Sequence, residues 1–257
     1  MKYFFITSLG RSGTKFLSKL INNSEEVICK HEPYRQDYLN IGLSYYYPNS
    51  TILNDNLKKR FNSIKKNNLK LEHSSYGEVN SLLRYNTDWL KSNLNAKIVH
   101  IIRNPKDVVR SIYSRNVYKD GSSHIEIIPK NENLYSKKWI TMTRFEKICW
   151  YWVHTNEVLE KNIDVRFRFE DLIKDYNIFL ELINYLDIPV ISKELWLYEI
   201  KNPRNTSKTN LFRKRLKGLL NFKLIKDDDI GDYSMWSEEQ KNSFNKICSK
   251  MMHKYGY

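Results

Sequence analysis

The sequence predicts an α/β fold with a mainly parallel central sheet flanked by helices. Short apolar runs alternate along the chain with segments of helical periodicity, which is typical of strands joined by crossover helices. The 257 residues, 41% of them hydrophobic, are sufficient to bury one large core without disulfides. Neither an internal repeat nor a linker divides the chain. We therefore expect one domain over residues 1–257.

The elements can be assigned in chain order. Apolar runs of strand length occupy residues 3–7, 27–29, 69–72, 97–102 and 165–169. Apolar residues at helical spacing occupy residues 14–21, 78–94, 104–116, 145–159, 175–186 and 237–252. Residues 34–68 have weak periodicity and are expected to form surface helices and loops. Residues 121–139 are expected to form a long connection.

The composition limits the possible partners and compartments. A formal net charge of +14 favours an anionic partner such as a nucleotide, nucleic acid, lipid head group or sulfated glycan. Cys29, Cys149 and Cys248 are too far apart for a metal site or a redox motif, so we expect no metal and a reducing, cytoplasmic environment. Polar Thr7 and Ser8 interrupt the N-terminal apolar run, so neither a signal peptide nor a transmembrane segment is predicted.

A Gly-containing loop follows the first predicted strand. Residues 8–15 read Ser-Leu-Gly-Arg-Ser-Gly-Thr-Lys and lead into the first helix, where backbone N–H groups and the helix dipole can surround a phosphate or sulfate. Gly10 and Gly13 permit close approach of an anion to the backbone. The arrangement is P-loop-like, but it is not a Walker A motif, because the order Gly-Lys-Ser/Thr is replaced by Gly13-Thr14-Lys15.

A second anion-binding pattern follows the strand at residues 97–102. Arg103 stands at the strand end, Asn104 can cap the next helix, and Pro105 occupies its first position. Ser111 projects from the second turn of that helix, so that Arg103 and Ser111 can reach one phosphate. Ligands of open α/β sheets bind at the carboxyl ends of the strands, which places both patterns at the same edge.

These two patterns resemble the nucleotide-binding motifs of sulfotransferases. Arg11-Ser12-Gly13-Thr14 is similar to the 5′-phosphosulfate loop found in carbohydrate and tyrosylprotein sulfotransferases, and residues 99–115 resemble the family's 3′-phosphate motif. Residues 169–172 and the C-terminal Gly256-Tyr257 resemble the family less specifically; we expect structural roles for Glu170 and Asp171, as a helix cap and in a local ion pair.

The resemblance implies an enzyme that moves a sulfuryl group from 3′-phosphoadenosine-5′-phosphosulfate (PAPS) to a hydroxyl or amine and releases 3′,5′-bisphosphoadenosine (PAP). It implies no metal. Arg11 would stabilise the charge on the departing bridging oxygen, and Lys15 departs from the family's commoner Thr or Ser. The implied nucleotide-binding residues are Gly10, Arg11, Ser12, Gly13, Thr14, Lys15, Arg103 and Ser111.

The general base is assigned by the same resemblance. In tyrosylprotein and several carbohydrate sulfotransferases an acidic residue stands about twenty residues after the phosphosulfate loop, and Glu32 occupies that place. A carboxylate there can accept the acceptor's proton. His31 is the adjacent alternative, because aryl-specific members use a His base, and His73 and Glu78 are further candidates.

Two other functions are compatible with parts of the sequence. A P-loop-like small-molecule kinase would share the first loop, but the Walker Lys-Ser/Thr pair and a metal-binding Asp at a later strand end are missing. A basic nucleic-acid-binding protein would account for the charge and the 18 Tyr, but no known module is recognisable and no nucleic acid is expected.

The sequence leaves the acceptor open between a small molecule, a glycan and a lipid. Residues 34–47 and 121–139 are expected to contact the acceptor, and the basic residues 204–217 are expected to cover the nucleotide. The oligomeric state is not readable from the sequence.

Overall fold

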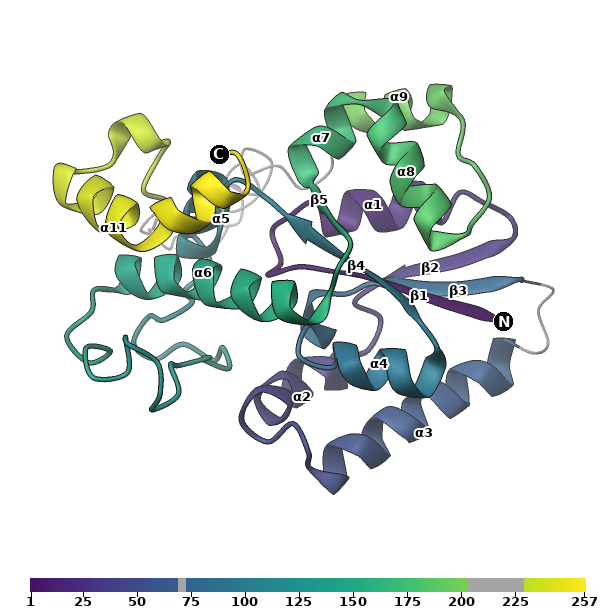
Figure 1. The fold of residues 1–257 in the computed structure, drawn as a ribbon, viewed down its shortest axis with the longest axis horizontal. Coiled ribbons are helices and arrows are strands. Elements are labelled where there is room, and N and C mark those ends of the chain that lie inside the picture. Colours follow the sequence, from purple (N-terminus) through teal and green to yellow (C-terminus); the bar gives the residue numbers. More distant parts are fainter. Residues whose placement is uncertain (69–72, 203–228) are drawn as a thin grey trace, which may run out of the picture.

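Five parallel strands form one sheet in the order β2-β3-β1-β4-β5 (Figure 1). The strands are β1 (Lys2–Thr7), β2 (Val27–His31), β3 (Ser75–Val79), β4 (Lys97–Ile102) and β5 (Arg166–Arg168). The computed structural model describes residues 1–68, 73–202 and 229–257. Every strand pairing in it is parallel, which confirms the predicted fold class.

Helices cover both faces of the sheet (Figure 1). One face carries α1 (Thr14–Ile21), α7 (Phe169–Lys174), α8 (Tyr176–Leu186) and α9 (Lys193–Lys201). The other carries α2 (Arg35–Tyr46), α3 (Thr51–Asn68) and α4 (Thr87–Leu94), with the short 3-10 turn η1 (Ser81–Leu83) after β3. The chain thus builds a three-layer arrangement with the sheet in the middle.

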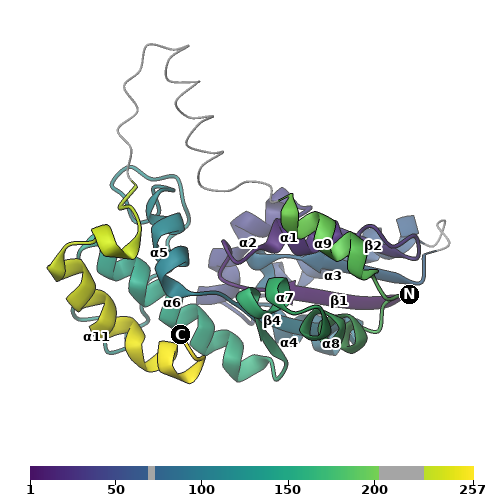
Figure 2. The ribbon, with the colours of Figure 1, turned by 90° about the horizontal axis from the view of Figure 1, so that it is seen from above.

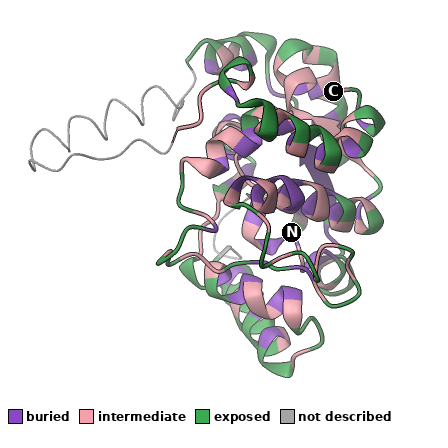
Figure 3. Ribbon diagram, turned by 90° about the vertical axis from the view of Figure 1, so that its left-hand side faces the viewer, coloured by how far each residue is buried: buried purple, intermediate pink, exposed green. Residues whose placement is uncertain are grey.

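The side-chain alternation of β1 explains the two cores. Phe4 and Ile6 point to the α1 side, where they join a buried cluster with Leu17 of α1. Phe5 points to the opposite side and packs in a second cluster with Phe61 of α3. In Figure 3 the exposed positions lie on the outer turns of the helices and in the connections.

A third group of helices lies beside the sheet (Figure 2). The helices of this group are α5 (Pro105–Tyr113), α6 (Arg144–Asn162) and α11 (Glu238–Lys254). The 3-10 turn η2 (Tyr233–Met235) directly precedes α11. Their shared core includes Trp152, Cys149 and Cys248, and the cysteines are free thiols. None of the described helices is long and apolar enough to cross a membrane. As predicted, neither helix nor strand occupies residues 121–139, which lead into α6.

The segment after residue 72 differs from the sequence prediction. The single helix expected at residues 78–94 is wrong, because Ser75–Val79 form β3, Ser81–Leu83 form the 3-10 turn η1 and only Thr87–Leu94 form an α-helix. All five residues of β3 are buried, so the strand lacks the alternation that would reveal it. Glu78 in this strand forms an ion pair with Arg60 of α3 at 2.7 Å, a contact between two different elements of the fold. The strand expected at residues 69–72 lies outside the described residues.

Smaller differences concern helix ends and short helices. The helix that Asn104 caps ends at Tyr113, not near residue 116. Neither α7 nor α9 was predicted; α7 begins directly at the end of β5 and has only six residues. These helices close the α1 face, and α9 carries residues that line a cavity beside the first loop.

Candidate active site

The loop after β1 adopts a backbone suited to hold an anion. Gly10, Arg11 and Gly13 have left-handed φ values of 95°, 60° and 75°. Such turns direct consecutive N–H groups into one concavity, and here that concavity lies at the N-terminus of α1. Gly13 is required for a second reason, since a Cβ there would lie 1.9 Å from the ring of Phe169. The loop therefore packs against Phe169, the first residue of α7, with no room for a side chain.

The two predicted anion-binding motifs meet in space. Arg11 Nε donates to Ser111 Oγ at 2.8 Å, and Arg103 Nη1 donates to the carbonyl oxygen of Arg11 at 2.9 Å. Ser111 lies on α5 and Arg103 at the end of β4, the strand that pairs with β1. The guanidinium groups of Arg11 and Arg103 thus share one region at the carboxyl edge of the sheet.

Arg103 is held from several sides. Asp107 accepts from Arg103 Nη2 at 3.0 Å, and Trp152 Nε1 donates to the Arg103 carbonyl oxygen at 3.2 Å. The guanidinium also lies 5.3 Å from the centre of the Phe169 ring. These contacts come from α5, α6 and the start of α7, so the orientation of Arg103 is set by the fold.

The turn that follows Arg103 is anchored through Glu170. Asn104 N donates to Glu170 Oε1 at 3.0 Å, and Tyr257 Oη donates to Glu170 Oε2 at 2.8 Å. Asn104 in turn caps α5 by accepting from Lys106 N at 3.0 Å. Glu170 links the C-terminal residue to the start of α5, and Asp171 pairs with Arg168 at 3.4 Å.

Positive charge is concentrated at Arg11. Burial, together with the neighbouring cations Arg115 and Arg103, lowers the pKa of Arg11 to about 10, while Glu32 acts in the opposite direction. The group remains protonated at neutral pH. A partly buried cation that is repelled by two others is stabilised by a bound anion, which is the charge that phosphate and sulfate groups supply.

Glu32 lies beside the same loop, at the end of β2. Ser81 Oγ donates a short hydrogen bond to Glu32 Oε1. The same hydroxyl lies 3.4 Å from the position that a Cβ on Gly10 would take. Ser81 therefore lies beside the loop and binds the carboxylate, so that Glu32 stands near the anion-binding backbone. Nothing in the sequence indicated Ser81, because the strand that it follows was not recognised.

His31 lies on the other side of Glu32 and contacts α1. Its Nε2 is 2.9 Å from Thr14 Oγ1, and its Nδ1 is 3.9 Å from Glu32 Oε2. Burial lowers the pKa of His31, and the charges of Lys15 and Arg11 lower it too, whereas Glu32 opposes them. His31 is therefore neutral at neutral pH and has an imidazole nitrogen that can accept a proton.

The structure separates His73 and Glu78 from this site. His73 precedes β3 and lies at the amino edge of the sheet, where its Nδ1 is 2.8 Å from the Glu25 carbonyl oxygen. Glu78 is 0% exposed, and its carboxylate accepts hydrogen bonds from Arg60 and Tyr76. His73 thus lies before a strand of the described sheet, while the strand expected ahead of it at residues 69–72 lies outside the described residues. The burial of Glu78 indicates a structural role.

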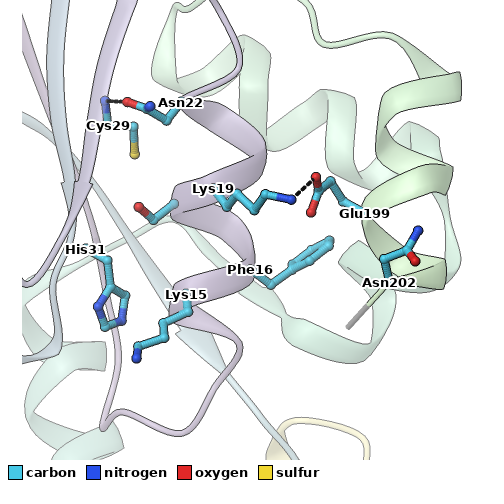
Figure 4. Close-up of a pocket in the computed structure, with 9 residues that line it drawn as sticks. Lys15, Phe16, Lys19, Asn22, Cys29, His31, Glu199 and Asn202 are labelled. Carbon is cyan, nitrogen blue, oxygen red and sulfur yellow. Dashed lines mark hydrogen bonds and ion pairs between the residues drawn. The ribbon is translucent and has the colours of Figure 1, made fainter. Parts of the chain in front are cut away.

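A cavity of about 540 Å³ adjoins the loop on the α1 side. Figure 4 shows Lys15 and His31 at one end and the ion pair between Lys19 and Glu199 further along, linking α1 to α9. The cavity is lined by Lys15, Phe16, Ser18, Lys19, Asn22, Cys29, His31, Glu199 and Asn202. Most of its lining residues are polar, but polar and apolar atoms contribute about equally to its wall, and Phe16 supplies a phenyl ring.

The tyrosines of α2 bind the long connection rather than open space. Tyr38 Oη is 2.9 Å from His124 Nδ1, Tyr46 Oη donates to the Glu126 carbonyl oxygen at 3.1 Å, and Tyr45 Oη donates to that of Ile128 at 3.0 Å. The two regions expected to contact the acceptor thus contact each other. The expected nucleotide cover at residues 204–217 lies outside the described residues. Within the described ranges, no group of three or more His, Cys, Asp or Glu could hold a metal ion.

Comparison with known proteins identifies the family. The sulfotransferase domain model matches residues 2–256. Similar solved structures include the sulfotransferase domain from the curacin biosynthetic pathway, with 13% identity, a TM-score of 0.48 and 97% of each chain covered. A mouse sulfotransferase complexed with PAP has 13% identity and a TM-score of 0.47, with 98% of this chain and 85% of that chain covered.

Retinol dehydratase in complex with androsterone and the inactive cofactor PAP is more distant, with 11% identity and a TM-score of 0.38, covering 98% of this chain and 81% of that one. No curated protein matches the sequence. The family model nevertheless spans nearly the whole chain. The chain therefore belongs to the sulfotransferase family and is an enzyme that transfers a sulfuryl group from PAPS.

Proposed function

We propose that residues 1–257 act as one domain that transfers the PAPS sulfuryl group in line to a hydroxyl or amine, with Glu32 as the general base. The observation that carries this proposal is the position of Ser81, which donates to Glu32 Oε1 and lies beside Gly10 of the anion-binding loop. A base must stand within reach of the reacting group. The contact brings a carboxylate to the loop that would hold the sulfuryl end of the nucleotide.

The nucleotide would be held at both of its charged ends. The N–H groups of residues 10–15 would bind the 5′-phosphosulfate, and Arg103 and Ser111 the 3′-phosphate. Arg11 lies between them, since its side chain reaches Ser111 while its backbone belongs to the loop. When the bond from sulfur to the 5′-phosphate oxygen breaks, negative charge grows on that oxygen, and the Arg11 guanidinium would stabilise it.

The acceptor hydroxyl would lose its proton to Glu32 as its oxygen attacks sulfur. Ser81 occupies Oε1 of that carboxylate, which leaves Oε2 to accept the proton. His31 is the second candidate, because burial lowers its pKa and it lines the cavity beside the loop. If Glu32 is the base, Glu32→Gln should remove turnover; if His31 is the base, His31→Gln should remove it.

The cavity in Figure 4 suggests the acceptor's chemical character. Its volume of about 540 Å³ lies in the range of small-ligand sites, and its hydroxyl, amide and ammonium groups with the Phe16 ring suit a polar, hydroxyl-bearing small molecule or glycan better than a lipid. We place the enzyme in the cytoplasm, in keeping with three buried free thiols. Nucleic acid is not expected as a partner.

Binding tests come first. PAP should raise the melting temperature of the protein more than ATP with Mg²⁺ does, because a ligand that binds only the native state stabilises it. A larger shift with ATP and Mg²⁺ would favour the kinase alternative. This measurement tests the nucleotide assignment and needs no knowledge of the acceptor.

Glu32→Gln tests the base. We expect a PAP dissociation constant within about twofold of wild type, with loss of PAP release from PAPS, measured in water and with a panel of phenol, sugar and amine acceptors. Glu25→Gln, exposed ahead of β2, is the matched control and should retain turnover. If Glu32→Gln still turns over and His31→Gln does not, the base is His31.

A further inference from the structure

We propose that Ser81 and Arg84 are positioning residues that hold the Glu32 carboxylate against the phosphosulfate loop. This inference rests on the proposed role of Glu32 as base. Neither residue belongs to a motif found in the sequence, and both follow β3, on the opposite side of β1 from Arg103. Their function would be to fix where the proton is accepted.

The turn that carries Ser81 is fixed at its beginning. Asn80 N donates to the Ile6 carbonyl oxygen at 2.9 Å, and Asn80 Oδ1 accepts from Leu82 N at 2.9 Å, which caps the 3-10 turn. Ser81 itself is 6% exposed. Its hydroxyl has one proton to donate, and that proton goes to Glu32 Oε1.

Glu32 has a backbone that needs such support. Its φ is 42°, in the left-handed region where a residue with a side chain is strained by of order 1–3 kcal/mol. The side chain is 28% exposed, so water can hydrogen-bond to only part of the carboxylate. A hydrogen bond from Ser81 fixes the carboxylate in one orientation, with Oε2 3.9 Å from His31 Nδ1 and free of the Ser81 contact.

Arg84 fixes the same turn from its other end. Its Nη1 donates to the Ser81 carbonyl oxygen at 2.6 Å, and its Nη2 donates a short hydrogen bond to Tyr151 Oη. The guanidinium lies 5.0 Å from the ring centre of Tyr85 and 5.4 Å from that of Tyr151. Arg84 thereby ties the turn after β3 to α6.

The burial of Arg84 argues for a specific purpose. The residue is 3% exposed, and among the residues that the structure describes no carboxylate forms an ion pair with it. Removing a cation from water without a counter-charge is costly. A shorter polar or apolar residue would avoid that cost but could not span from the Ser81 carbonyl oxygen to Tyr151. Position 84 therefore requires a side chain long enough to join the Ser81 carbonyl oxygen to Tyr151.

The decisive variants are Ser81→Thr and Ser81→Val, which have nearly the same shape and differ in the hydroxyl. We expect Ser81→Val to lower kcat for PAP release from PAPS roughly 10- to 100-fold through misplacement of the base. The PAPS KM and the PAP dissociation constant should stay within about twofold. Ser81→Thr should recover most of the lost kcat. Tyr151→Phe, which removes only the acceptor of Arg84, should lower kcat by about 3- to 10-fold.

Ser243→Ala is the control, because Ser243 Oγ donates to Glu146 Oε1 at 3.0 Å in the α6 and α11 layer, far along the chain from the loop. It removes the same kind of contact and should leave kcat unchanged. Circular dichroism would establish that each variant folds. If both Ser81 variants failed to fold, Tyr151→Phe alone would decide, and wild-type kcat in it would overturn the proposal.

Other outcomes separate this inference from the proposed base. Equal kcat values for Ser81→Val and Ser81→Thr, with turnover absent in Glu32→Gln, would overturn the positioning role and leave the base in place. A large rise in the PAP dissociation constant of Ser81→Val would also overturn it, since Ser81 would then shape the nucleotide loop. Retained turnover in Glu32→Gln would overturn both.

Discussion

Arg103 donates a hydrogen bond from Nη1 to the backbone carbonyl oxygen of Arg11, at a distance of 2.9 Å. The two residues are far apart in the chain but lie at the ends of the paired strands β4 and β1. The guanidinium of Arg103 therefore supports the left-handed turn at Arg11 as well as facing the site assigned to the 3′-phosphate. A substitution of Arg103 should therefore weaken binding of both the 3′-phosphate and the 5′-phosphosulfate of the nucleotide.

Arg103→Ala should abolish the preference for 3′-phosphorylated nucleotides. A hydrogen bond to a charged group contributes about 1.5–3 kcal/mol, so PAP affinity should fall roughly 10- to 150-fold, while adenosine 5′-phosphosulfate affinity falls less. Isothermal titration calorimetry with both nucleotides gives the ratio. Lys97→Ala, at the opposite end of β4, is the control. An unchanged ratio in Arg103→Ala would contradict the assignment.

Gly13→Ala should destabilise the protein and weaken PAP binding. The new Cβ would lie 1.9 Å from the Phe169 ring, and the residue would keep a φ of 75°. Gly121→Ala isolates the effect of the left-handed φ, because Gly121 has a φ of 73° and nothing lies within 4 Å of its Cβ position. We expect urea unfolding to report a free-energy loss for Gly13→Ala that exceeds that of Gly121→Ala by roughly 1–3 kcal/mol. Equal losses would mean that the ring moves freely.

Asp37→Asn should change how stability depends on pH. The pKa of Asp37 is raised from 3.8 to about 6. Burial is the main cause; Arg60 acts to lower the pKa, and Glu78 acts to raise it. The folded state thus binds the proton more tightly than the unfolded state, and this carboxyl contributes stability that is present below about pH 3.8 and lost as pH rises through 6. The loss amounts to roughly 3 kcal/mol.

The asparagine variant lacks this titration. Relative to wild type, its free energy of unfolding should therefore rise between pH 4 and pH 6.5 (about the window set by the two pKa values) and stay level above it. Urea unfolding at a series of pH values measures the difference. Asp55→Asn, exposed on α3, is the control. A difference between Asp37→Asn and wild type that does not vary with pH would contradict the assigned pKa.

Tyr257→Phe should destabilise the start of α5. The hydroxyl donates to Glu170 Oε2, and Glu170 Oε1 accepts from Asn104 N, so removing the hydroxyl leaves the carboxylate with one partner fewer. We expect a loss of about 1–2 kcal/mol in the free energy of unfolding and a weaker affinity for PAP. Tyr198→Phe, at a side chain that is 59% exposed, should have no effect. Unaltered PAP binding in Tyr257→Phe would separate the C-terminus from the nucleotide site.

Local sequence rules predicted well the backbone elements around the two candidate anion-binding motifs. The loop at residues 8–15, the helix at Thr14–Ile21 and the cap at Asn104 all depend on neighbours within a few residues, and the structure places these elements where they were expected. Whether Arg11, Arg103 and Ser111 bind PAPS stays a prediction. Their mutual contact follows from the pairing of β1 with β4.

The acceptor side could not be predicted in the same way. Recognising β3 requires knowing that Glu78 is neutralised by Arg60 and that the strand is buried on both faces. Because the strand was expected at residues 69–72, His73 was assigned to its carboxyl end, whereas it precedes β3. The contact between Ser81 and Glu32 depends on the order β2-β3-β1, which no local pattern specifies.

The central position of β1 separates two sets of candidate site residues. The loop follows β1 and Arg103 follows the neighbouring strand β4, whereas Glu32 and Ser81 follow β2 and β3, which lie on the other side of β1. With the roles proposed above, donor recognition and proton removal belong to opposite halves of the sheet. Evolution could then remodel the β2–β3 half for new acceptors while the distance between the nucleotide's anchoring points stayed set by one pair of neighbouring strands.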